Sequence, residues 1–247
     1  MLGIVGFVMA GPAPRKFPPR VVALDGDDTL WHNETIFTTS HDQFRDLLTR
    51  HVEIDRAGID EHLLAVERRN LRTYGYGIKG FVLSMIETAI EVTQGKIPAD
   101  DIDAILRFGR VMIDHPVDLI EGAREVIDTL RARDHEVWLI TKGDLFDQES
   151  KIARSGLTEL FHRIEIVSEK DEQTYRRLIE RHGVEAEEFA MVGNSIRSDI
   201  LPVTAIGAAA FHVPYHVTWA HEVVAGEVSA EFVTLSSLRE LPSALGW

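Results

Sequence analysis

The sequence VVALDGDDTLW, residues 21–31, decides which fold we expect for this chain. Its four leading apolar residues are typical of a short buried strand, and three aspartates around one glycine follow at once. Carboxylates are costly to bury unless a cation or water compensates their charge. A strand that ends in such a cluster predicts a ligand site just beyond it, where open α/β sheets bind their ligands.

The polar residues after the strand alternate, so in an extended backbone Asp25, Asp27 and Thr29 point to the same side. Asp25 could attack a phosphorus atom as a carboxylate nucleophile. Asp27 could protonate a leaving oxygen and then activate water. Thr29 adds a hydroxyl group, Gly26 leaves room between the acids, and a hard divalent cation such as Mg²⁺ would compensate the charge. Taken alone, the stretch also fits an ordinary acidic turn.

The composition limits the classes of function. The chain has 247 residues, of which 45% are hydrophobic and 27% charged, enough for a core domain and a smaller one. Its net charge of -14 argues against a nucleic-acid partner, although a local cationic site can still bind a small anion. The chain has no cysteine, which excludes disulfides, thiolate catalysis and zinc–thiolate sites.

The N-terminal segment over residues 2–10 is apolar but too short to span a membrane. A secretory signal would need a basic residue before this segment, and none is present. We therefore expect residues 1–19 to form a peripheral extension. No other segment is long and apolar enough to cross a bilayer, so the sequence predicts a cytoplasmic protein without a membrane partner.

The pattern turns helical after the first strand. Apolar residues recur at helical spacing in about four segments, and strand patterns rich in valine are absent. We predict an all-helical domain over residues 33–115. It is inserted into an α/β core domain formed by residues 20–32 and 116–247.

Residues 68–80 of this helical region combine cations, two tyrosines and three glycines, and we expect them to form a loop. One interpretation is a substrate-recognition loop in which Arg72 and Lys79 contact the substrate. A solvated surface turn beside a basic helix end explains the same residues. The sequence leaves both interpretations open.

The second chemical signal follows the strand predicted over residues 136–140. The strand leads into Thr141, Lys142 and Gly143, and a new helix begins just after them. A hydroxyl beside a helix N-terminus suits a phosphate group, because free backbone N–H groups and the positive end of the helix dipole lie there. Taken alone, this threonine is more often a helix cap.

Two further strand ends carry polar residues. Lys170 follows the strand over 164–167 and stands at a helix start, where its charge opposes the dipole; this placement suggests an anion nearby. Asn194 and Asp199 follow the strand over 189–193, and their side chains offer oxygen atoms of the kind that Mg²⁺ binds.

These four strand ends, in this order, resemble the four motifs of the haloacid dehalogenase (HAD) superfamily, most of whose members are Mg²⁺-dependent phosphohydrolases. The resemblance covers nearly all of residues 20–215 and implies an α/β fold with a doubly wound, parallel, Rossmann-like sheet. The helical insertion between the first two motifs resembles the cap that many members carry. Two positions depart from the family: Lys142 stands where asparagine is common, and Asn194 stands where an acid is expected.

The resemblance implies an Mg²⁺-dependent phosphatase that hydrolyses a small phosphomonoester through an aspartyl-phosphate on Asp25. Asp27 would be the acid and base, and Thr141 and Lys170 would stabilise the transferring charge. The implied metal ligands are Asp25, Asp27, Asn194 and Asp199. The candidate substrate contacts are Thr29, Lys142, Gly143, Arg72 and Lys79.

Three alternatives stay open to different degrees. A phosphomutase would keep all four motifs. A dehalogenase has no need of a second acid, so Asp27 argues against it. A binding or regulatory protein on the same scaffold gains some support from Asn194, whereas the intact Asp25, Thr141 and Lys170 argue against it. The sequence predicts neither the particular ester nor the oligomeric state.

Overall fold

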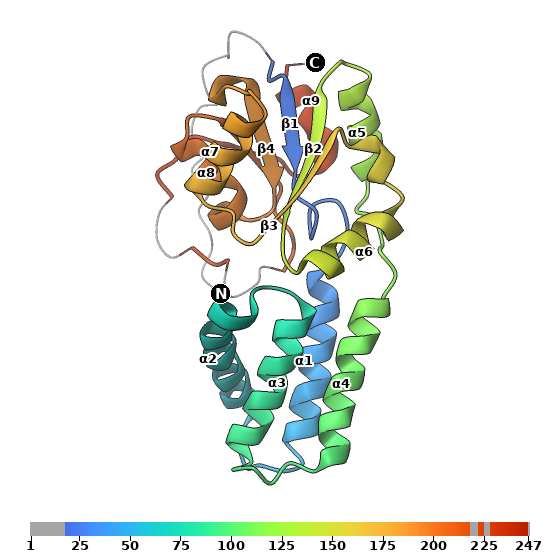
Figure 1. Ribbon diagram of the computed structural model, residues 1–247, viewed down its shortest axis with the longest axis vertical. Helices are drawn as coiled ribbons and strands as arrows, with labels where there is room; N and C mark the ends of the chain where they lie inside the picture. Colours follow the sequence, from blue (N-terminus) through green and yellow to red (C-terminus); the bar gives the residue numbers. More distant parts are fainter. Residues whose placement is uncertain (1–17, 218–221, 225–227, 247) are drawn as a thin grey trace.

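The computed structural model describes residues 18–217, 222–224 and 228–246. It consists of an α/β core and a bundle of helices that extends from one end of it (Figure 1). The predicted extension over residues 1–19 lies almost wholly outside the described residues. The predicted fold class, a parallel α/β sheet with an inserted helical region, is confirmed.

The sheet of the core has six strands, all parallel, in the order β3-β2-β1-β4-β5-β6. The chain order reverses between β1 and β4, and the crevice at such a reversal is where doubly wound sheets bind ligands. The strand bounds are β1 Val21–Leu24, β2 Glu136–Lys142, β3 Arg163–Val167, β4 Phe189–Gly193, β5 Ala209–His212 and β6 Val233–Thr234.

The register of the three central strands brings their ends together. Leu24 of β1 lies beside Leu139 of β2 and Val192 of β4. Because parallel strands run in the same direction, the residues that follow these three positions reach the same edge of the sheet. Asp25, Thr141 and Asn194 belong to those segments, and the sheet geometry therefore gathers the first, second and fourth predicted motifs.

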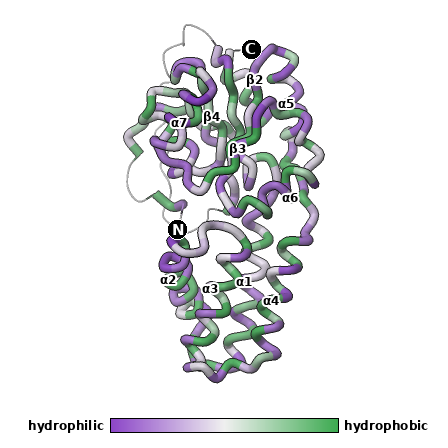
Figure 2. The backbone as a smooth tube through the Cα atoms, in the orientation of Figure 1, coloured by the Kyte–Doolittle hydropathy of each residue, from purple (hydrophilic) through white to green (hydrophobic). Residues whose placement is uncertain are grey.

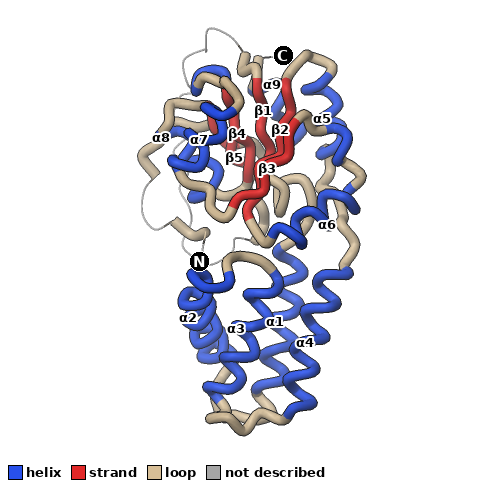
Figure 3. The backbone as a smooth tube through the Cα atoms, in the orientation of Figure 1, coloured by secondary structure: helices blue, strands red, loops and turns tan. Residues whose placement is uncertain are grey.

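Helices cover both faces of the sheet, as a doubly wound fold requires (Figure 3). Successive β1 residues alternate between two apolar clusters. On one face Val22 packs with residues of α5 (Ala123–Arg131), α6 (Leu145–Ser155) and α9 (Leu241–Ala244). On the other face Ala23 packs with residues of α7 (Glu172–Arg181) and α8 (Leu201–Ala205).

The insertion between β1 and β2 is the helical region that we predicted. Its helices α1 to α4 lie side by side below the core, and hydrophobic residues recur along each of them (Figure 2). Buried Phe44, Leu63, Met85 and Ile105, one from each helix, belong to an apolar cluster of its own. The bounds are α1 Glu34–Leu48, α2 Arg56–Tyr74, α3 Ile78–Val92 and α4 Ala99–Asp114. We call these four helices, with the segments that join them, the cap.

The loop predicted over residues 68–80 is wrong for most of its length. Helix α2 continues to Tyr74, because no glycine or proline interrupts residues 68–74. Gly75, with φ of 70°, ends the helix in a conformation that other residues rarely adopt. Only Gly75, Tyr76 and Gly77 connect α2 to α3, which begins at Ile78.

None of the helices that the structure describes combines the length and apolar character needed to cross a membrane. The longest of them, α2, has 19 residues, but charged side chains occur along its whole length. The cytoplasmic location stays a prediction.

Candidate active site

A cavity of about 140 Å³ lies between the strand ends of the core and the cap. The core contributes residues from all four predicted motifs, and the cap contributes carboxylates, amides and aromatic rings. The lining residues used below are Asp25, Asp27, Thr141, Lys142, Gly143, Lys170, Asn194 and Asp199 from the motifs, Gln148, Lys151 and Glu222 from other core segments, and Glu34, Glu67, Tyr76 and Phe81 from the cap.

The nucleophile candidate, Asp25, is the first residue after β1 and is 7% exposed. Its backbone N–H donates to the Val192 carbonyl at 2.9 Å, which fixes the backbone against β4. Oδ1 forms an ion pair with Lys170, and Oδ2 accepts from the Thr29 hydroxyl at 3.3 Å. Burial raises the pKa of Asp25 to about 7, and the positive charge of Lys170 limits that rise.

Lys170 joins two buried carboxylates. Its side chain is 2% exposed, and Nζ contacts Asp25 Oδ1 and, at 2.7 Å, Asp199 Oδ1. Burial lowers the pKa of this ammonium group, but the negative charges of Asp199 and Asp25 outweigh burial and raise the pKa well above its ordinary value. The structure therefore places a permanent positive charge against the nucleophile candidate.

Asp199 contacts Lys170, and each of its two carboxylate oxygens has a partner within the protein. One oxygen pairs with Lys170, and the other accepts from the Ser195 backbone N–H at 3.0 Å. A side chain at Gly193 would overlap the Asp199 carboxylate, so this close approach requires glycine. In the structure Asp199 therefore positions Lys170, and the direct contact with a metal ion that we predicted for it stays a prediction.

The amide of Asn194 tests whether the site fits a divalent cation. Its side-chain oxygen accepts from the Thr29 hydroxyl at 3.3 Å, and it also lies 3.3 Å from two acceptor oxygens, Asp25 Oδ2 and the backbone carbonyl oxygen of Asp27. Acceptor oxygens repel one another unless a proton or a cation lies among them. Turning the amide by 180° would let its nitrogen donate to both oxygens. A hard cation there would instead bind all three oxygens, the ligand type that Mg²⁺ prefers, so the residues fit this ion.

The three oxygen atoms around this position do not all come from acidic side chains. Within the part of the chain that the structure describes, no three histidine or acidic side chains gather as a metal site. One carboxylate, one backbone carbonyl and one amide supply the oxygens, and Asp27 takes part through its backbone.

The carboxylate of Asp27 accepts hydrogen bonds from three side chains. Trp31 Nε1 donates to Oδ1 at 2.7 Å, Gln148 Nε2 donates to Oδ2 at 2.9 Å, and Lys151 Nζ lies 2.8 and 2.7 Å from the two oxygens. Burial raises the pKa of Asp27, but Lys151 and the other two donors outweigh burial. The pKa of Asp27 therefore lies below its ordinary value. The ionised form is the one a base needs, whereas the acid role that we also predicted requires a proton on this group.

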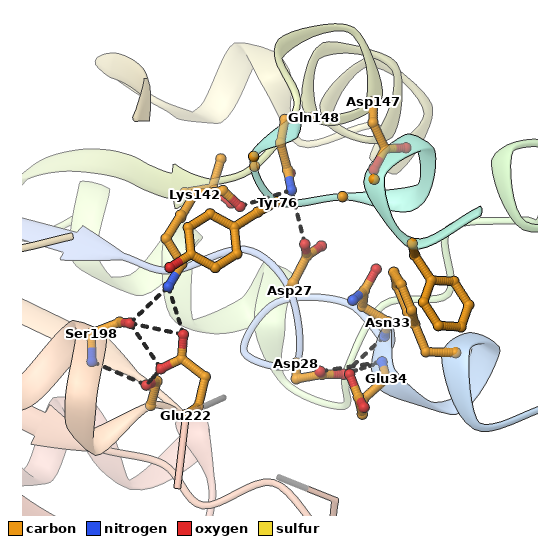
Figure 4. A pocket seen from close by; sticks show the side chains of 18 of the residues that line it. Asp27, Asp28, Asn33, Glu34, Tyr76, Lys142, Asp147, Gln148, Ser198 and Glu222 are labelled. Carbon is orange, nitrogen blue, oxygen red and sulfur yellow. Dashed lines mark hydrogen bonds and ion pairs between the residues drawn. The ribbon is translucent and has the colours of Figure 1, made fainter. Parts of the chain in front are cut away.

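Lys142 is one of the predicted substrate contacts, and its ammonium group contacts other residues of the protein. Nζ lies 2.6 Å from Glu222 and 3.1 Å from the Ser198 hydroxyl, and the Tyr76 ring lies 4.2 Å away (Figure 4). Burial raises the pKa of Glu222, but Lys142 outweighs burial and lowers it below its ordinary value. Glu222 lies far along the chain from every motif, and no spacing pattern pointed to it. Gly143 and Thr141 line the cavity as expected.

Three other predicted substrate contacts lie elsewhere. Thr29 is 1% exposed and bonds Asp25, so it supports the nucleophile and does not face the cavity. Lys79 pairs with Asp144 at 2.8 Å on the surface. Arg72 is exposed on α2 and does not line the cavity. The cations Arg72 and Lys79 were assigned to a recognition loop that is largely helix, and the helix turns them outward.

The cap wall carries residues that sequence analysis missed. Glu34, in the first turn of α1, lines the cavity near Asp28 (Figure 4). Burial raises the pKa of Glu34 to about 8, and the charges of Asp28, Glu67 and Asp27 contribute to the rise. On the sequence, Glu34 is an ordinary acid at a helix start, and only the packing of the cap on the core reveals its surroundings.

Residues 19–207 match the family described as haloacid dehalogenase-like hydrolase. A crystal structure of a haloacid dehalogenase-like family hydrolase from Xanthomonas campestris is 45% identical, with a TM-score of 0.82; the match covers 96% of this chain and 95% of that one. No curated protein is significantly similar to this chain in sequence.

Two more distant structures share the fold. The HAD-hydrolase YfnB from Bacillus subtilis, whose structure is bound to magnesium, is 16% identical with a TM-score of 0.65; the match covers 93% of this chain and 100% of that one. A protein from Haemophilus somnus described as a predicted phosphoglycolate phosphatase is 13% identical with a TM-score of 0.61; here the coverage is 91% and 96%. At this identity the likeness shows the fold alone.

Proposed function

The chain belongs to the haloacid dehalogenase-like hydrolases, and we propose that it is an Mg²⁺-dependent phosphatase that hydrolyses a small phosphomonoester through an aspartyl-phosphate on Asp25. One observation carries the proposal. A buried carboxylate at the end of β1 is paired with a buried ammonium group at the edge of a cavity, and Thr141 lines the same cavity. A nucleophile and a fixed positive charge are what phosphoryl transfer to a carboxylate needs.

The residues would divide the chemistry into two steps. In the first, Asp25 forms a bond to phosphorus, the ester P–O bond breaks, and Asp27, after taking up a proton, gives it to the departing oxygen. In the second, Asp27 takes a proton from a water molecule as that water attacks phosphorus and releases Asp25. Lys170 and Thr141 would stabilise the charge on the phosphoryl oxygens in both steps.

Asp25, the Asp27 carbonyl and Asn194 would hold the Mg²⁺ ion. The ion would neutralise negative charge on the phosphoryl group when bound. The uncharged amide of Asn194 supplies less attraction than a carboxylate would, so we expect weaker affinity for the metal than an aspartate would give.

The proposed substrate is a small phosphorylated metabolite, and we propose neither a nucleic-acid nor a membrane partner. The net charge of -14 supports the first exclusion. The enclosed cavity supports a small substrate, because the cap covers the strand ends. Asp27 supports a phosphatase over a dehalogenase, since displacement at carbon has no use for a second acid.

The test is phosphate release from a panel of small phosphate esters, with Mg²⁺ and then with EDTA, for the wild type and Asp25→Asn. We expect activity that the chelator abolishes and that Asp25→Asn lowers at least about 10⁴-fold. Asp103→Asn, on the exposed face of α4, is the matched control and should keep full activity. Activity that survives EDTA or Asp25→Asn would contradict the proposal. Conversion of an ester to its isomer without phosphate release would indicate a phosphomutase.

A further inference from the structure

A second buried lysine, Lys151, lies beside the proposed acid–base residue. It is on α6, is 8% exposed, and belongs to none of the four strand-end motifs. Its Nζ contacts both carboxylate oxygens of Asp27, at 2.8 and 2.7 Å. An ammonium group is costly to bury, and replacing such a pair with apolar groups is often neutral or favourable for stability. Stability alone is therefore a weak reason for this pair.

The other donors to Asp27 complete a fixed arrangement. Oδ1 of Asp27 accepts from Trp31 Nε1 and from Lys151 Nζ. Oδ2 accepts from Gln148 Nε2 and also from Lys151 Nζ. Figure 4 shows Gln148 directed at Asp27. Each carboxylate oxygen thus accepts from two donors, of which Gln148 and Lys151 both lie on α6. Donors on both oxygens restrict the rotation of the carboxylate, which is otherwise free to turn about its terminal bond.

These donors are themselves held by the sheet. Gln148 and Lys151 are three residues apart, so they share one face of α6. Gln148 also donates to the Lys142 carbonyl at the end of β2, at 3.3 Å. The side chain of Asp144 caps α6 by accepting from the Asp147 N–H at 3.1 Å. The helix therefore begins at a defined place beyond β2, and the position of Asp27 is tied to the strand that carries Thr141.

We propose that Lys151 is a positioning residue that acts through Asp27, holding its carboxylate at the edge of the cavity where the leaving oxygen departs. This inference rests on the proposed phosphatase function. Lys151 also contacts the Asn33 side chain at 3.2 Å, immediately before the first cap helix. The lysine thus connects the acid–base residue of the core with the start of the cap.

The leaving group distinguishes positioning from a structural role. An acid contributes most when the departing oxygen is strongly basic, as in an alkyl ester, and little when it is a phenolate that departs readily. Misplacing Asp27 should therefore slow the first step, phosphoryl transfer to Asp25, far more for an alkyl phosphate than for p-nitrophenyl phosphate. The second step is the same for both esters, so kcat/KM, which reports the first step, is the quantity to compare. A general loosening of the fold would slow both reactions alike.

The experiment compares the wild type, Lys151→Met and Lys151→Arg on glycerol 2-phosphate and p-nitrophenyl phosphate. For Lys151→Met we expect kcat/KM to fall about 100-fold on the alkyl ester and less than about 10-fold on the aryl ester. Lys151→Arg, which keeps the charge and donors, should recover at least about a tenth of the lost activity.

Gln148→Met provides a second variant in case Lys151→Met does not fold. It removes one donor and keeps the charge pair, and we expect a fall of about 5-fold in kcat/KM confined to the alkyl ester. Lys96→Met, at an exposed position far from the cavity, is the matched control and should change neither substrate. Equal losses on both esters, or no loss in folded variants, would overturn the inference while the phosphatase function stands. A wild type that hydrolyses neither ester would contradict the proposed function itself.

Discussion

The core and the cap treat charge in opposite ways. In the core, Asp25, Lys170 and Asp199 are 7%, 4% and 1% exposed and contact one another at the strand ends. In the cap, Arg69 pairs with Glu87 and Glu91 on the surface, and its side chain is 53% exposed. Buried pairs depend on an exact partner, whereas exposed pairs contribute little. The charged residues at the strand ends of the core should therefore tolerate almost no change, whereas the surface pairs of the cap should tolerate many.

The connection between the two regions is slight compared with their internal packing. Tyr76 of the cap donates to Glu169 at 2.7 Å, and Lys79 pairs with Asp144 at 2.8 Å. The cap has its own apolar cluster and does not share the two clusters of the core. This separation means that cap residues facing the cavity can vary while the strand ends keep the same chemistry.

The largest effect should come from removing the buried cation of the core. Lys170→Met leaves Asp25 and Asp199 buried without a positive partner, a change that costs about 3–5 kcal/mol in comparable buried pairs. We expect a large drop in the midpoint of urea unfolding and a loss of phosphate release of at least about 10³-fold. Both can be measured on the same preparation.

Arg69→Met is the matched variant in the cap. It removes the cation from two ion pairs, as Lys170→Met does, but on the surface. We expect its unfolding midpoint and its phosphate release to stay close to the wild-type values, because water solvates the carboxylates that remain. Similar losses in the two variants would show that burial does not separate the two regions in the way described.

Two glycines sharpen the comparison further. A side chain at Gly193 of the core would overlap Asp199, and a side chain at Gly109 of the cap would overlap Val82. Gly193→Ala should displace the residue that holds Lys170 and lower activity about 10- to 100-fold. Gly109→Ala should force α3 and α4 apart, costing about 1–3 kcal/mol, partly offset by about 1 kcal/mol of helix propensity. We expect its activity to stay unchanged.

Phosphate release and urea unfolding measured on both alanine variants check this pair. The expected pattern is a loss of activity with a smaller loss of stability at Gly193, and the reverse at Gly109. If Gly109→Ala lowers activity as much as Gly193→Ala, the packing of the cap controls the strand ends, and the two regions are not separate in function.

The core was predictable because its signals are local. Each buried strand is a short apolar run, and the residue after it carries the chemistry, so Asp25, Thr141 and Asn194 can be found by reading along the chain. Strand register then brings them together without further information. The end of α2 was less predictable, because the cations and tyrosines of residues 68–74 looked like loop chemistry although nothing there breaks a helix.

The residues missed at the site share a different property. Gln148, Lys151, Glu222 and Glu34 reach the cavity only through packing between distant segments, and each is unremarkable where it stands in the sequence. Lys151 stands on a helix among other polar residues, and nothing local indicates that Asp27 lies against it. The contact between Asp199 and Lys170 was missed for the same reason, since the two residues are 29 positions apart.

The smallest expected effect concerns a carboxylate of the cap wall. Burial raises the pKa of Glu34 from 4.5 to about 8. The unfolded chain therefore releases this proton at a lower pH than the folded chain does, and the folded state loses stability as the pH rises through that window. Glu34→Gln, which cannot ionise, avoids the loss. We expect it to be more stable than the wild type by about 2 kcal/mol at pH 9 and to differ little at pH 5.

Urea unfolding of both proteins at the two pH values measures this difference. Glu61→Gln, an exposed position on α2, is the control and should shift stability equally at pH 5 and pH 9. Asp25, Asp27 and Asp199 each contact a buried lysine, whereas the groups that shift Glu34 are carboxylates that raise its pKa. A variant no more stable than the wild type at pH 9 would mean that Glu34 ionises as freely in the folded protein as in water. Ionising Glu34 would then not lower the stability of the folded protein. The contrast between the core and the cap would rest on the surface ion pairs of the cap alone.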